Sequence, residues 1–266
     1  MASVVTILAD AMCPSPNNGS AIEFHNVSYC PNGGALLLSN LNLEIQRGET
    51  LVLLGRSGSG KTTTLKLINR LLTATEGEIR VDGRPLGEWD VIRLRRMVGY
   101  VIQEAGLFPH YTVERNIALV PKIEGWPAER IHNRVQEMLH LVGLDRQLAS
   151  RYPRELSGGQ RQRVGVARAL AVDPPFLLMD EPFGALDPLT RAELQREFLA
   201  LQKRLQKTVV FVTHDLREAL LLGSRIALLE AGQLVAVHAK TEFMASQNPL
   251  VVAYQQAFDA GLGENS

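Results

Sequence analysis

The amino-acid sequence predicts an α/β fold with a parallel core sheet, an antiparallel β subdomain on the N-terminal side and a helical insert. Three observations support this prediction. Residues 50–54 form a continuous apolar run, as expected for a strand that is buried on both faces of a sheet. Apolar runs at 176–179 and 209–212 flank an amphipathic helical pattern at 191–206, and such β-α-β alternation is typical of a parallel sheet. Between 104 and about 152, apolar residues recur at helical spacing instead.

Shorter strand patterns surround the run at 50–54. Apolar residues at 22, 24 and 27 begin one strand, and those at 41, 43 and 45 alternate with polar residues before the Arg47-Gly48 turn. Residues 78–81 precede a second turn, and 226–229 and 234–237 are predicted to form a late hairpin. The N-terminal strands are expected to pair in a small antiparallel sheet.

A glycine-rich loop joins the strand at 50–54 to a helical pattern that follows it. Residues 55–62 read GRSGSGKT, which fits the pattern G-x-x-x-x-G-K-[ST]. Its glycines let backbone N–H groups surround phosphates, its lysine supplies a cation, and its threonine hydroxyl binds magnesium. The sequence therefore predicts a triphosphate site, with Thr62 as a metal ligand, built from Gly55, Arg56, Ser57, Gly58, Ser59, Gly60, Lys61, Thr62 and Thr63.

Two carboxylates follow the strand pattern at 176–179, at the sheet edge where ligands of open α/β sheets bind. Asp180 is predicted to hold Mg²⁺, directly or through water, and Glu181 to act as a general base toward the attacking water. His214 follows the strand at 209–213 and either donates a hydrogen bond to the γ-phosphate or only caps the strand. Gln103 follows 98–102 and is predicted to contact magnesium or the attacking water.

A second anion-binding pattern precedes the helical run that contains Val164 and Leu170. Its serine and glycines present a hydroxyl and bare N–H groups at a helix start, and it comprises Ser157, Gly158, Gly159 and Gln160. Two phosphate-recognising surfaces in one chain require either two triphosphates or two chains. By itself, the same pattern also fits a plain serine-capped helix.

Composition limits the classes of protein to consider. The chain has 266 residues, of which 45% are hydrophobic, and its 28 Lys+Arg balance 28 Asp+Glu, so its overall charge does not indicate a nucleic-acid partner. No stretch reaches the roughly 18 apolar residues of a membrane-spanning helix, so any transport would need separate membrane subunits. Two cysteines are too few for a disulfide scaffold or a zinc site.

The domain organisation predicted from these patterns is a single nucleotide-binding domain at 21–240, with a helical subdomain inserted at about 104–165. Residues 1–20 are expected to form a flexible extension without a secretory signal. Residues 241–266 are expected to form only a short tail.

Six motifs, in this order, resemble those of the ABC transporter ATPases over residues 22–237. The family's Walker A falls on 55–62, its Q-loop glutamine on Gln103, its signature on 156–160, its D-loop on 185–187, and its switch histidine on His214. Its Walker B aspartate and catalytic glutamate fall on Asp180 and Glu181. The resemblance implies ATP and Mg²⁺ as ligands and a head-to-tail homodimer. In that dimer, ATP held by residues 55–62 of one copy meets residues 157–160 of the other.

The same resemblance implies that dimer closing and opening drive permease subunits from the cytoplasmic face of the plasma (inner) membrane, with this chain bound peripherally. Residues 61–71 and 99–110 are similar to the ATPases of bacterial importers for glycine betaine, choline and related quaternary amines. An extracytoplasmic substrate-binding protein would then belong to the complex. Some of those ATPases carry a C-terminal pair of CBS modules, for which residues 241–266 are too few.

Alternatives remain open at this point. The cargo does not touch this chain, so another small-molecule importer or a lipid or lipoprotein transporter fits the same motifs. A soluble ABC ATPase of DNA repair or translation fits less well, because coiled-coil insertions, zinc-binding cysteines and a second ATPase half are missing from the sequence. The family usually stacks an aromatic residue on adenine a few residues after Val27; Pro31 occupies that place here. Tyr29 is the predicted base contact, although the sequence leaves open which side chain stacks.

Overall fold

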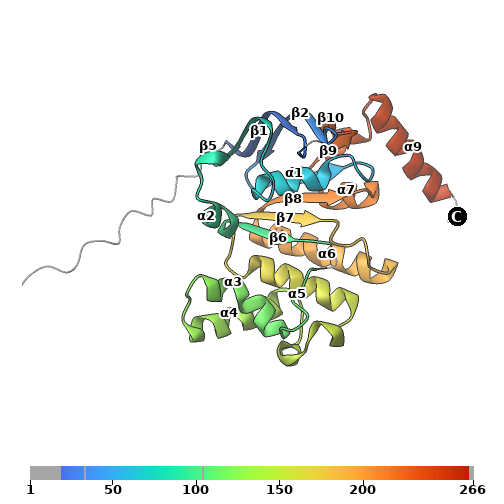
Figure 1. Ribbon diagram of the computed structural model, residues 1–266. Coiled ribbons are helices and arrows are strands. Elements are labelled where there is room, and N and C mark those ends of the chain that lie inside the picture. Colours follow the sequence, from blue (N-terminus) through green and yellow to red (C-terminus); the bar gives the residue numbers. More distant parts are fainter. Residues whose placement is uncertain (1–18, 33, 104, 264–266) are drawn as a thin grey trace, which may run out of the picture.

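The computed structural model describes residues 19–32, 34–103 and 105–263, with side chains as far as residue 258. Figure 1 shows two sheets with their covering helices in one body and a group of helices beside it. Most of the predicted N-terminal extension, residues 1–18, lies outside the described residues. Its last residue, Ser20, begins strand β1, where it pairs with Gln46, so that residue is part of a sheet and the prediction was wrong there.

The smaller sheet is the predicted antiparallel one. Its strands are β1 (Ser20–Tyr29), β2 (Leu38–Gln46), β4 (Glu76–Val81) and β5 (Arg84–Pro85), in the order β2-β1-β4-β5. Phe24 of β1 lies opposite Leu43 on one neighbour and Ile79 on the other, and all three are buried. The alternation in the sequence therefore marks the face that packs on the core.

The larger sheet contains the predicted parallel strands. Its order is β10-β9-β3-β8-β7-β6. The five strands from β9 to β6 in this order run parallel to one another, while the edge strand β10 is antiparallel to β9. The bounds are β3 (Thr50–Leu54), β6 (Val98–Val101), β7 (Phe176–Asp180), β8 (Thr208–Thr213), β9 (Arg225–Glu230) and β10 (Gln233–Ala239). The carboxyl ends of β3, β7 and β8 consequently lie at one edge of the sheet.

Alternate residues of the larger sheet face two different hydrophobic cores. Leu51 and Leu53 of β3 belong to the core shared with helix α1 (Lys61–Ile68) and the antiparallel sheet. Val52 and Leu54 belong to the core shared with α5 (Gly158–Leu170), α6 (Pro188–Leu205) and α7 (Leu216–Leu222). Figure 1 shows α1 on one side of the sheet, with α5 and α6 on the other. Burial on both faces explains why the parallel strands are continuous apolar runs.

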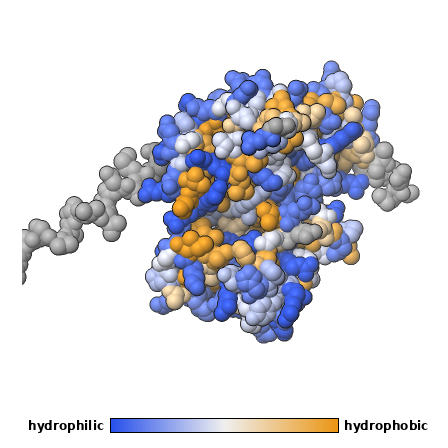
Figure 2. Space-filling view, viewed as in Figure 1, coloured by the Kyte–Doolittle hydropathy of each residue, from blue (hydrophilic) through white to orange (hydrophobic). Residues whose placement is uncertain are grey.

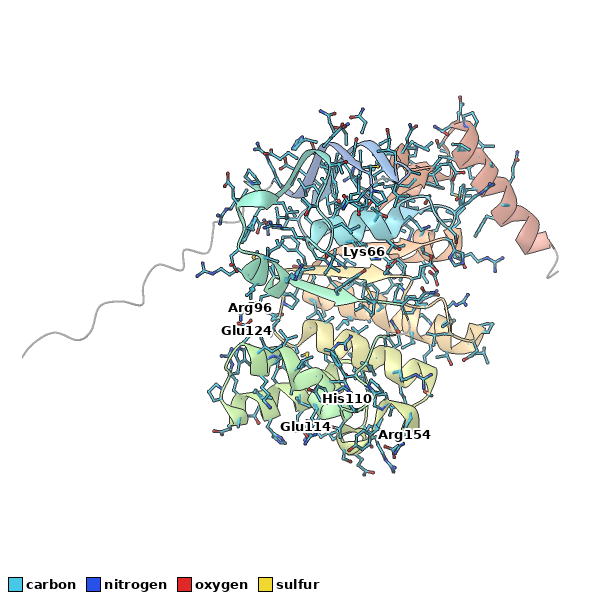
Figure 3. All side chains as sticks on the ribbon, viewed as in Figure 1. Lys66, Arg96, His110, Glu114, Glu124 and Arg154 are labelled. Atoms are coloured by element: carbon cyan, nitrogen blue, oxygen red, sulfur yellow. The ribbon has the colours of Figure 1, made fainter. Side chains whose placement is uncertain are left out.

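The group of helices beside the body lies between β6 and β7 in the sequence. It contains α3 (Val113–Ile123) and α4 (Ala128–Leu141), followed by single turns at Arg146–Ser150 and Pro153–Glu155. Val135, Met138 and Leu139 of α4 are buried, at the spacing predicted. Helix α2 (Val91–Arg96) is linked to this group by an ion pair between Arg96 and Glu124, which Figure 3 shows next to each other. The first residue of the predicted insert, Glu104, lies outside the described residues, and the boundaries at 104 and 165 stay a prediction.

The C-terminal segment, predicted only as a short tail, is mostly helical. It contains a short helix α8 (Lys240–Phe243) and a long one, α9 (Pro249–Gly263). The Asn248 side chain accepts a hydrogen bond from the Leu250 N–H at 3.0 Å, and an asparagine before a proline is a helix-start signal. Phe243 and Val251 are fully buried, and α9 contacts α7. Within the described part of the chain, every helix is too short or too polar to span a bilayer.

Candidate functional site

The glycine-rich loop lies between the end of β3 and the start of α1. Gly58 and Gly60 have φ angles of +82° and +101°, in the left-handed region that favours glycine. At Gly55 an added Cβ would lie 2.3 Å from the Leu229 carbonyl oxygen and 2.5 Å from Ser59 Oγ. The loop therefore needs glycine both for its turns and for its close approach to β9.

Lys61 is the first residue of α1, and only 4% of it is exposed. Its Nζ donates hydrogen bonds of 2.8 Å to the carbonyl oxygens of Gly55 and Arg56. Burial lowers the pKa of Lys61, while the charges of Glu181, Asp180 and Glu230 act in the opposite direction. Ser59 Oγ is also buried, without a hydrogen-bond partner among the described residues. A buried polar atom of this kind is expected to be satisfied by a ligand.

Thr62 and Asp180 meet across the loop and the end of β7. Thr62 Oγ1 donates to Asp180 Oδ1 at 2.9 Å, and the Tyr100 hydroxyl of β6 donates to Asp180 Oδ2 at 3.5 Å. Burial raises the pKa of Asp180, with a further increase from the charge of Glu181, whereas the bonds from Thr62 and Tyr100 lower it. A hydroxyl and a carboxylate oxygen side by side form the kind of donor set that Mg²⁺ takes. Burial likewise raises the pKa of Tyr100.

Glu181 follows Asp180 and contacts His214. It is a non-glycine residue with a φ angle of +44°, held there by a 3.1 Å hydrogen bond from its N–H to the Val212 carbonyl oxygen. His214 Nδ1 lies 3.3 Å from Glu181 Oε2. Strained backbone of this type is concentrated at functional sites. The two predicted catalytic side chains are thus brought together at the ends of β7 and β8.

The buried carboxylate of Glu218, on α7, stabilises the end of β8 next to His214. It accepts hydrogen bonds from the Thr213 hydroxyl at 2.6 Å and from the Gln195 side-chain amide at 3.0 Å. Burial raises the pKa of Glu218. Because Thr213 directly precedes His214, this buried network fixes the chain where the histidine leaves the sheet.

Gln103 lies two residues beyond the end of β6, with an exposed side chain. Because β6 runs parallel to β7, Gln103 and Asp180 lie toward the same sheet edge. Arg168 of α5 donates 2.8 Å hydrogen bonds to the carbonyl oxygens of Ala105 and Gly106, and its pKa is lowered by burial. A Cβ at Gly165 would lie 3.0 Å from the Ala105 Cβ. The segment after Gln103 is therefore packed tightly on the helix that begins with the serine-glycine pattern.

That pattern is internally satisfied at its helix start. Ser157 Oγ accepts a 3.2 Å hydrogen bond from the Gln160 N–H, and the Gln160 side chain accepts one of 2.9 Å from the Ser157 N–H. This reciprocal capping box stabilises the start of α5. Ser157 is nevertheless exposed, and no hydrogen bond recorded within the described chain joins residues 157–160 to residues 55–62.

Tyr29 is the last residue of β1, and its ring packs against the core of the antiparallel sheet. Its carbonyl oxygen accepts a 2.8 Å hydrogen bond from Leu37 N–H. A Cβ on Gly60 would lie 3.2 Å from the Leu37 carbonyl oxygen, so this part of the sheet lies beside the glycine-rich loop. The role of Tyr29 in binding a base stays a prediction.

Several residues near the loop were missed by sequence reasoning. Tyr100, Glu230 and Glu218 reach the site through strand order and helix packing, for which the sequence carries no local signal. A cavity beside the loop is lined on one side by Arg56, Ser57, His214 and Glu230 and on the other by α9. Asn248 before α9 and the proline at its first position are the one signal that could have indicated a helix there.

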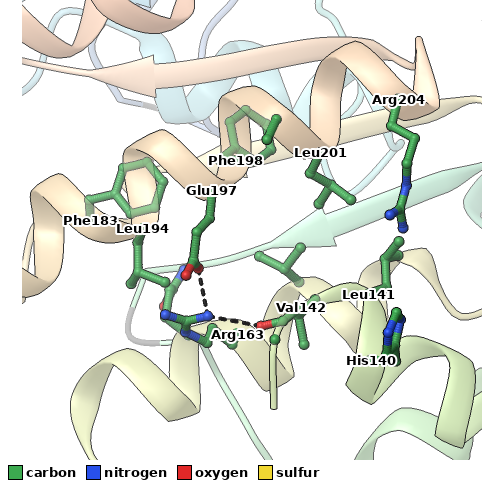
Figure 4. Close-up of a pocket in the computed structure, with 14 residues that line it drawn as sticks. His140, Leu141, Val142, Arg163, Phe183, Leu194, Glu197, Phe198, Leu201 and Arg204 are labelled. Carbon is green, nitrogen blue, oxygen red and sulfur yellow. Dashed lines mark hydrogen bonds and ion pairs between the residues drawn. The ribbon is translucent and has the colours of Figure 1, made fainter.

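A separate cavity of about 290 Å³ lies between α4, α5 and α6, and it contains none of the predicted site residues. Figure 4 shows Arg163 within it, joined to Glu197 and to the Val142 carbonyl oxygen. These contacts measure 2.6 Å and 3.0 Å. They connect α5 to α6 and to the end of α4, which is a structural role.

Comparison with known proteins places this geometry in a family. The model of the family described as ABC transporter matches residues 38–184, more than half of the chain. The choline transport ATP-binding protein OpuBA of Bacillus subtilis (strain 168) is 53% identical over 216 residues, which is 81% of this chain and 57% of that protein. The glycine betaine uptake system ATP-binding protein YehX of Escherichia coli (strain K12) is 52% identical over 214 residues, 80% of this chain and 69% of that protein. The chain thus spans little more than half the length of OpuBA.

A solved structure agrees with the sequence relatives. The ATP-binding cassette MJ0796, described as a dimer in a post-hydrolysis state bound to ADP and Pi, superposes with a TM-score of 0.73 at 36% identity. The match covers 82% of this chain and 98% of that one. Family model, relatives and fold therefore agree, and the chain belongs to the ABC transporter family and has the fold of its ATP-binding cassettes.

Proposed function

We propose that this chain is the ATP-hydrolysing subunit of an ABC importer for osmoprotectants such as glycine betaine or other quaternary amines. The observation that carries the proposal is the arrangement at one sheet edge. There the glycine-rich loop, the Thr62–Asp180 pair and the Glu181–His214 pair lie at the ends of β3, β7 and β8.

ATP binds with its phosphates against the loop of residues 55–62. Lys61 is expected to exchange its contacts with the loop carbonyl oxygens for the β- and γ-phosphates, because a buried ammonium gains more from an anion than from carbonyl dipoles. The α1 N-terminus adds its positive dipole end. Thr62, Asp180 and Gln103 would hold Mg²⁺, which neutralises charge on the phosphate oxygens when bound.

Glu181 accepts the proton of the attacking water, which is oriented in line with the γ-phosphate. His214 is close enough to Glu181 to orient that carboxylate, and it donates a hydrogen bond to the γ-phosphate. Gln103 completes the set by contacting the metal or the water. Catalysis then comes mainly from positioning and charge stabilisation.

The active unit is a head-to-tail homodimer. Residues 157–160 are internally capped in one copy, with Ser157 exposed, and the related cassette MJ0796 was solved as a dimer. Residues 157–160 of the second copy contact the γ-phosphate held by the first. Binding closes the pair and hydrolysis opens it, which gives a two-state cycle.

The partners are transmembrane permease subunits at the cytoplasmic face of the inner membrane, with an extracytoplasmic substrate-binding protein in the same complex. Figure 2 shows apolar surface gathered where the helices at 113–141 meet the rest of the molecule. Exposed apolar side chains of the described residues include Leu71, Ile92, Phe108 and Ile123. Such a patch is a suitable docking surface for a membrane subunit. The printed names of OpuBA and YehX, choline and glycine betaine transport proteins, support the choice of cargo.

Purification of the native membrane complex and its reconstitution in vesicles tests the proposal. With MgATP on the side of this chain, we expect uptake of radiolabelled glycine betaine or choline, and loss of uptake in the Glu181→Gln complex. A complex that hydrolyses ATP but takes up neither compound, and whose hydrolysis is stimulated by another solute, would contradict the proposed cargo. A complex without ATP hydrolysis would contradict the enzymatic role.

A further inference from the structure

Helix α9 forms one wall of a cavity of about 360 Å³ beside the glycine-rich loop. Figure 1 shows this helix standing out from the end of the body that carries β9 and β10. Four of its side chains face the cavity at positions i, i+3, i+4 and i+7, so they form one stripe along the helix. We call this the α9 stripe; it consists of Leu250, Ala253, Tyr254 and Ala257.

The α9 stripe is largely apolar and incompletely covered. Leu250 is 41% exposed, and Ala253 and Ala257 are exposed as well. The opposite wall of the cavity is formed by Arg56, Ser57 and His214, all from the predicted nucleotide site. The stripe and the glycine-rich loop therefore belong to one continuous surface.

A complementary feature lies at the start of α6. Leu189 is 84% exposed, the highest value among the large apolar side chains of the described residues. Its position is fixed, because Asp187 caps the helix by accepting a 3.1 Å hydrogen bond from the Thr190 N–H. A leucine presented so fully at a rigid helix start is suited to insertion into an apolar recess.

Leu189 belongs to the same surface as the serine-glycine pattern. A Cβ on Gly159 would lie 2.7 Å from Thr190 Cγ2, and one on Gly158 would lie 3.3 Å from Leu186 Cδ2. The start of α6 and residues 158–159 are therefore packed directly together. If residues 157–160 contact a surface of another copy, Leu189 therefore contacts a neighbouring part of the same surface.

Together these observations identify an occupant for the cavity. We propose that the α9 stripe is the docking surface for Leu189 of a second copy of this chain. The inference rests on the proposed head-to-tail dimer, in which residues 157–160 of one copy face residues 55–62 of the other. Because that arrangement has two-fold symmetry, the contact forms twice, once on each side. It adds an apolar clamp, outside the nucleotide contacts, to the closed pair.

Disulfide crosslinking tests the contact directly. The starting protein is the full chain with Cys13→Ser, Cys30→Ser and Glu181→Gln, which retains bound ATP. Leu189→Cys and Ala253→Cys are then combined, since both residues are exposed and both substitutions are small. With MgATP and a mild oxidant, we expect a crosslinked dimer on a non-reducing gel, and little crosslinking without nucleotide.

Two control pairs separate the inference from the proposed function on which it rests. Ser57→Cys with Ser157→Cys reports whether the glycine-rich loop and the serine-glycine pattern meet between copies. Ile123→Cys with Ala253→Cys reports random collision, because Ile123 is 63% exposed on the remote helix α3. Crosslinking of the 57–157 pair without the 189–253 pair would overturn the clamp and leave the dimer standing. Failure of both pairs would overturn the dimer, and the clamp with it.

An affinity measurement gives an independent result. In the Glu181→Gln background, Leu189→Asp is expected to weaken MgATP-driven dimerisation by about 100-fold or more, the scale of losing one buried leucine at each of two contacts. ATP binding by single copies should be unchanged, because Leu189 is not one of the residues of the predicted nucleotide site. Dimerisation as tight as in the parent would contradict the docking of Leu189.

Discussion

The glycine-rich loop and the serine-glycine pattern both suit phosphate, yet their polar groups are in opposite states. In the loop, Lys61 is buried against carbonyl oxygens and Ser59 Oγ has no partner among the described residues. In the pattern, Ser157 and Gln160 satisfy each other, and Ser157 remains exposed. The glycine-rich loop is therefore a cradle whose polar groups require a ligand. The pattern is a finished surface that one copy can present to another.

The largest effect is expected for the Glu181 carboxylate, in the site that contains the glycine-rich loop. Glu181→Gln keeps the size of the side chain but removes the proton acceptor, so hydrolysis of saturating MgATP should slow by about 10²-fold or more. ATP affinity should be retained, because the loop is intact. Phosphate release and equilibrium binding measure the two quantities, with Glu129→Gln on α4 as a control carboxylate that lies outside the site. Turnover equal to the parent would remove Glu181 from its proposed role.

The next effect separates the loop from the pattern by affinity. Lys61→Ala should weaken ATP binding by about 10-fold to 100-fold, the scale of one lost hydrogen bond to a charged group. The exposed Lys203→Ala on α6 should bind as the parent does, which controls for a general loss of positive charge. Isothermal titration with a non-hydrolysable ATP analogue measures both. Equal affinities for parent and Lys61→Ala would show that the cradle does not depend on this lysine.

A smaller effect is expected at the pattern. Ser157→Ala removes a helix cap and should lower the free energy of unfolding by about 1 kcal/mol. Affinity of single copies for ATP should not change, in contrast to Lys61→Ala. Urea denaturation and titration at a protein concentration too low for dimers give the two values. A large loss of affinity in Ser157→Ala would mean that the pattern binds nucleotide within its own copy.

The smallest effect is a pH dependence at the predicted metal site. Burial raises the pKa of Asp180 above its ordinary value of 3.8, so the folded state favours the neutral carboxyl. Asp180 therefore contributes stability that is present below pH 3.8 and is lost as the pH rises through its raised pKa. Without Mg²⁺, the melting temperature of Asp180→Asn minus that of the parent should increase over this range. A difference that is constant or decreases with pH would contradict the assignment.

Much of this site was predictable because its residues follow short, strongly patterned strands. The runs at 50–54 and 176–179 are apolar throughout since both faces are buried, and each leads directly into site residues. Tyr100 was not predictable, because its contact with Asp180 depends on β6 lying next to β7. Helix α9 was missed because residues 241–266 were interpreted only as a short tail, and the packing of this helix on α7 has no local signal in the sequence. The features that could not be predicted are therefore tertiary ones, namely the strand order and the packing of helices that are distant in the sequence.

The mass of the Glu181→Gln chain in solution, with and without MgATP, tests the central claim most directly. The claim is that the ATP site at the glycine-rich loop of one copy is completed by the serine-glycine pattern, residues 157–160, of another copy. Light scattering during size exclusion is predicted to give the mass of one chain without nucleotide and twice that mass with saturating MgATP, and introducing Ser157→Arg should prevent the doubling. A single-chain mass at saturating MgATP, under conditions where ATP binding is confirmed, would contradict the account.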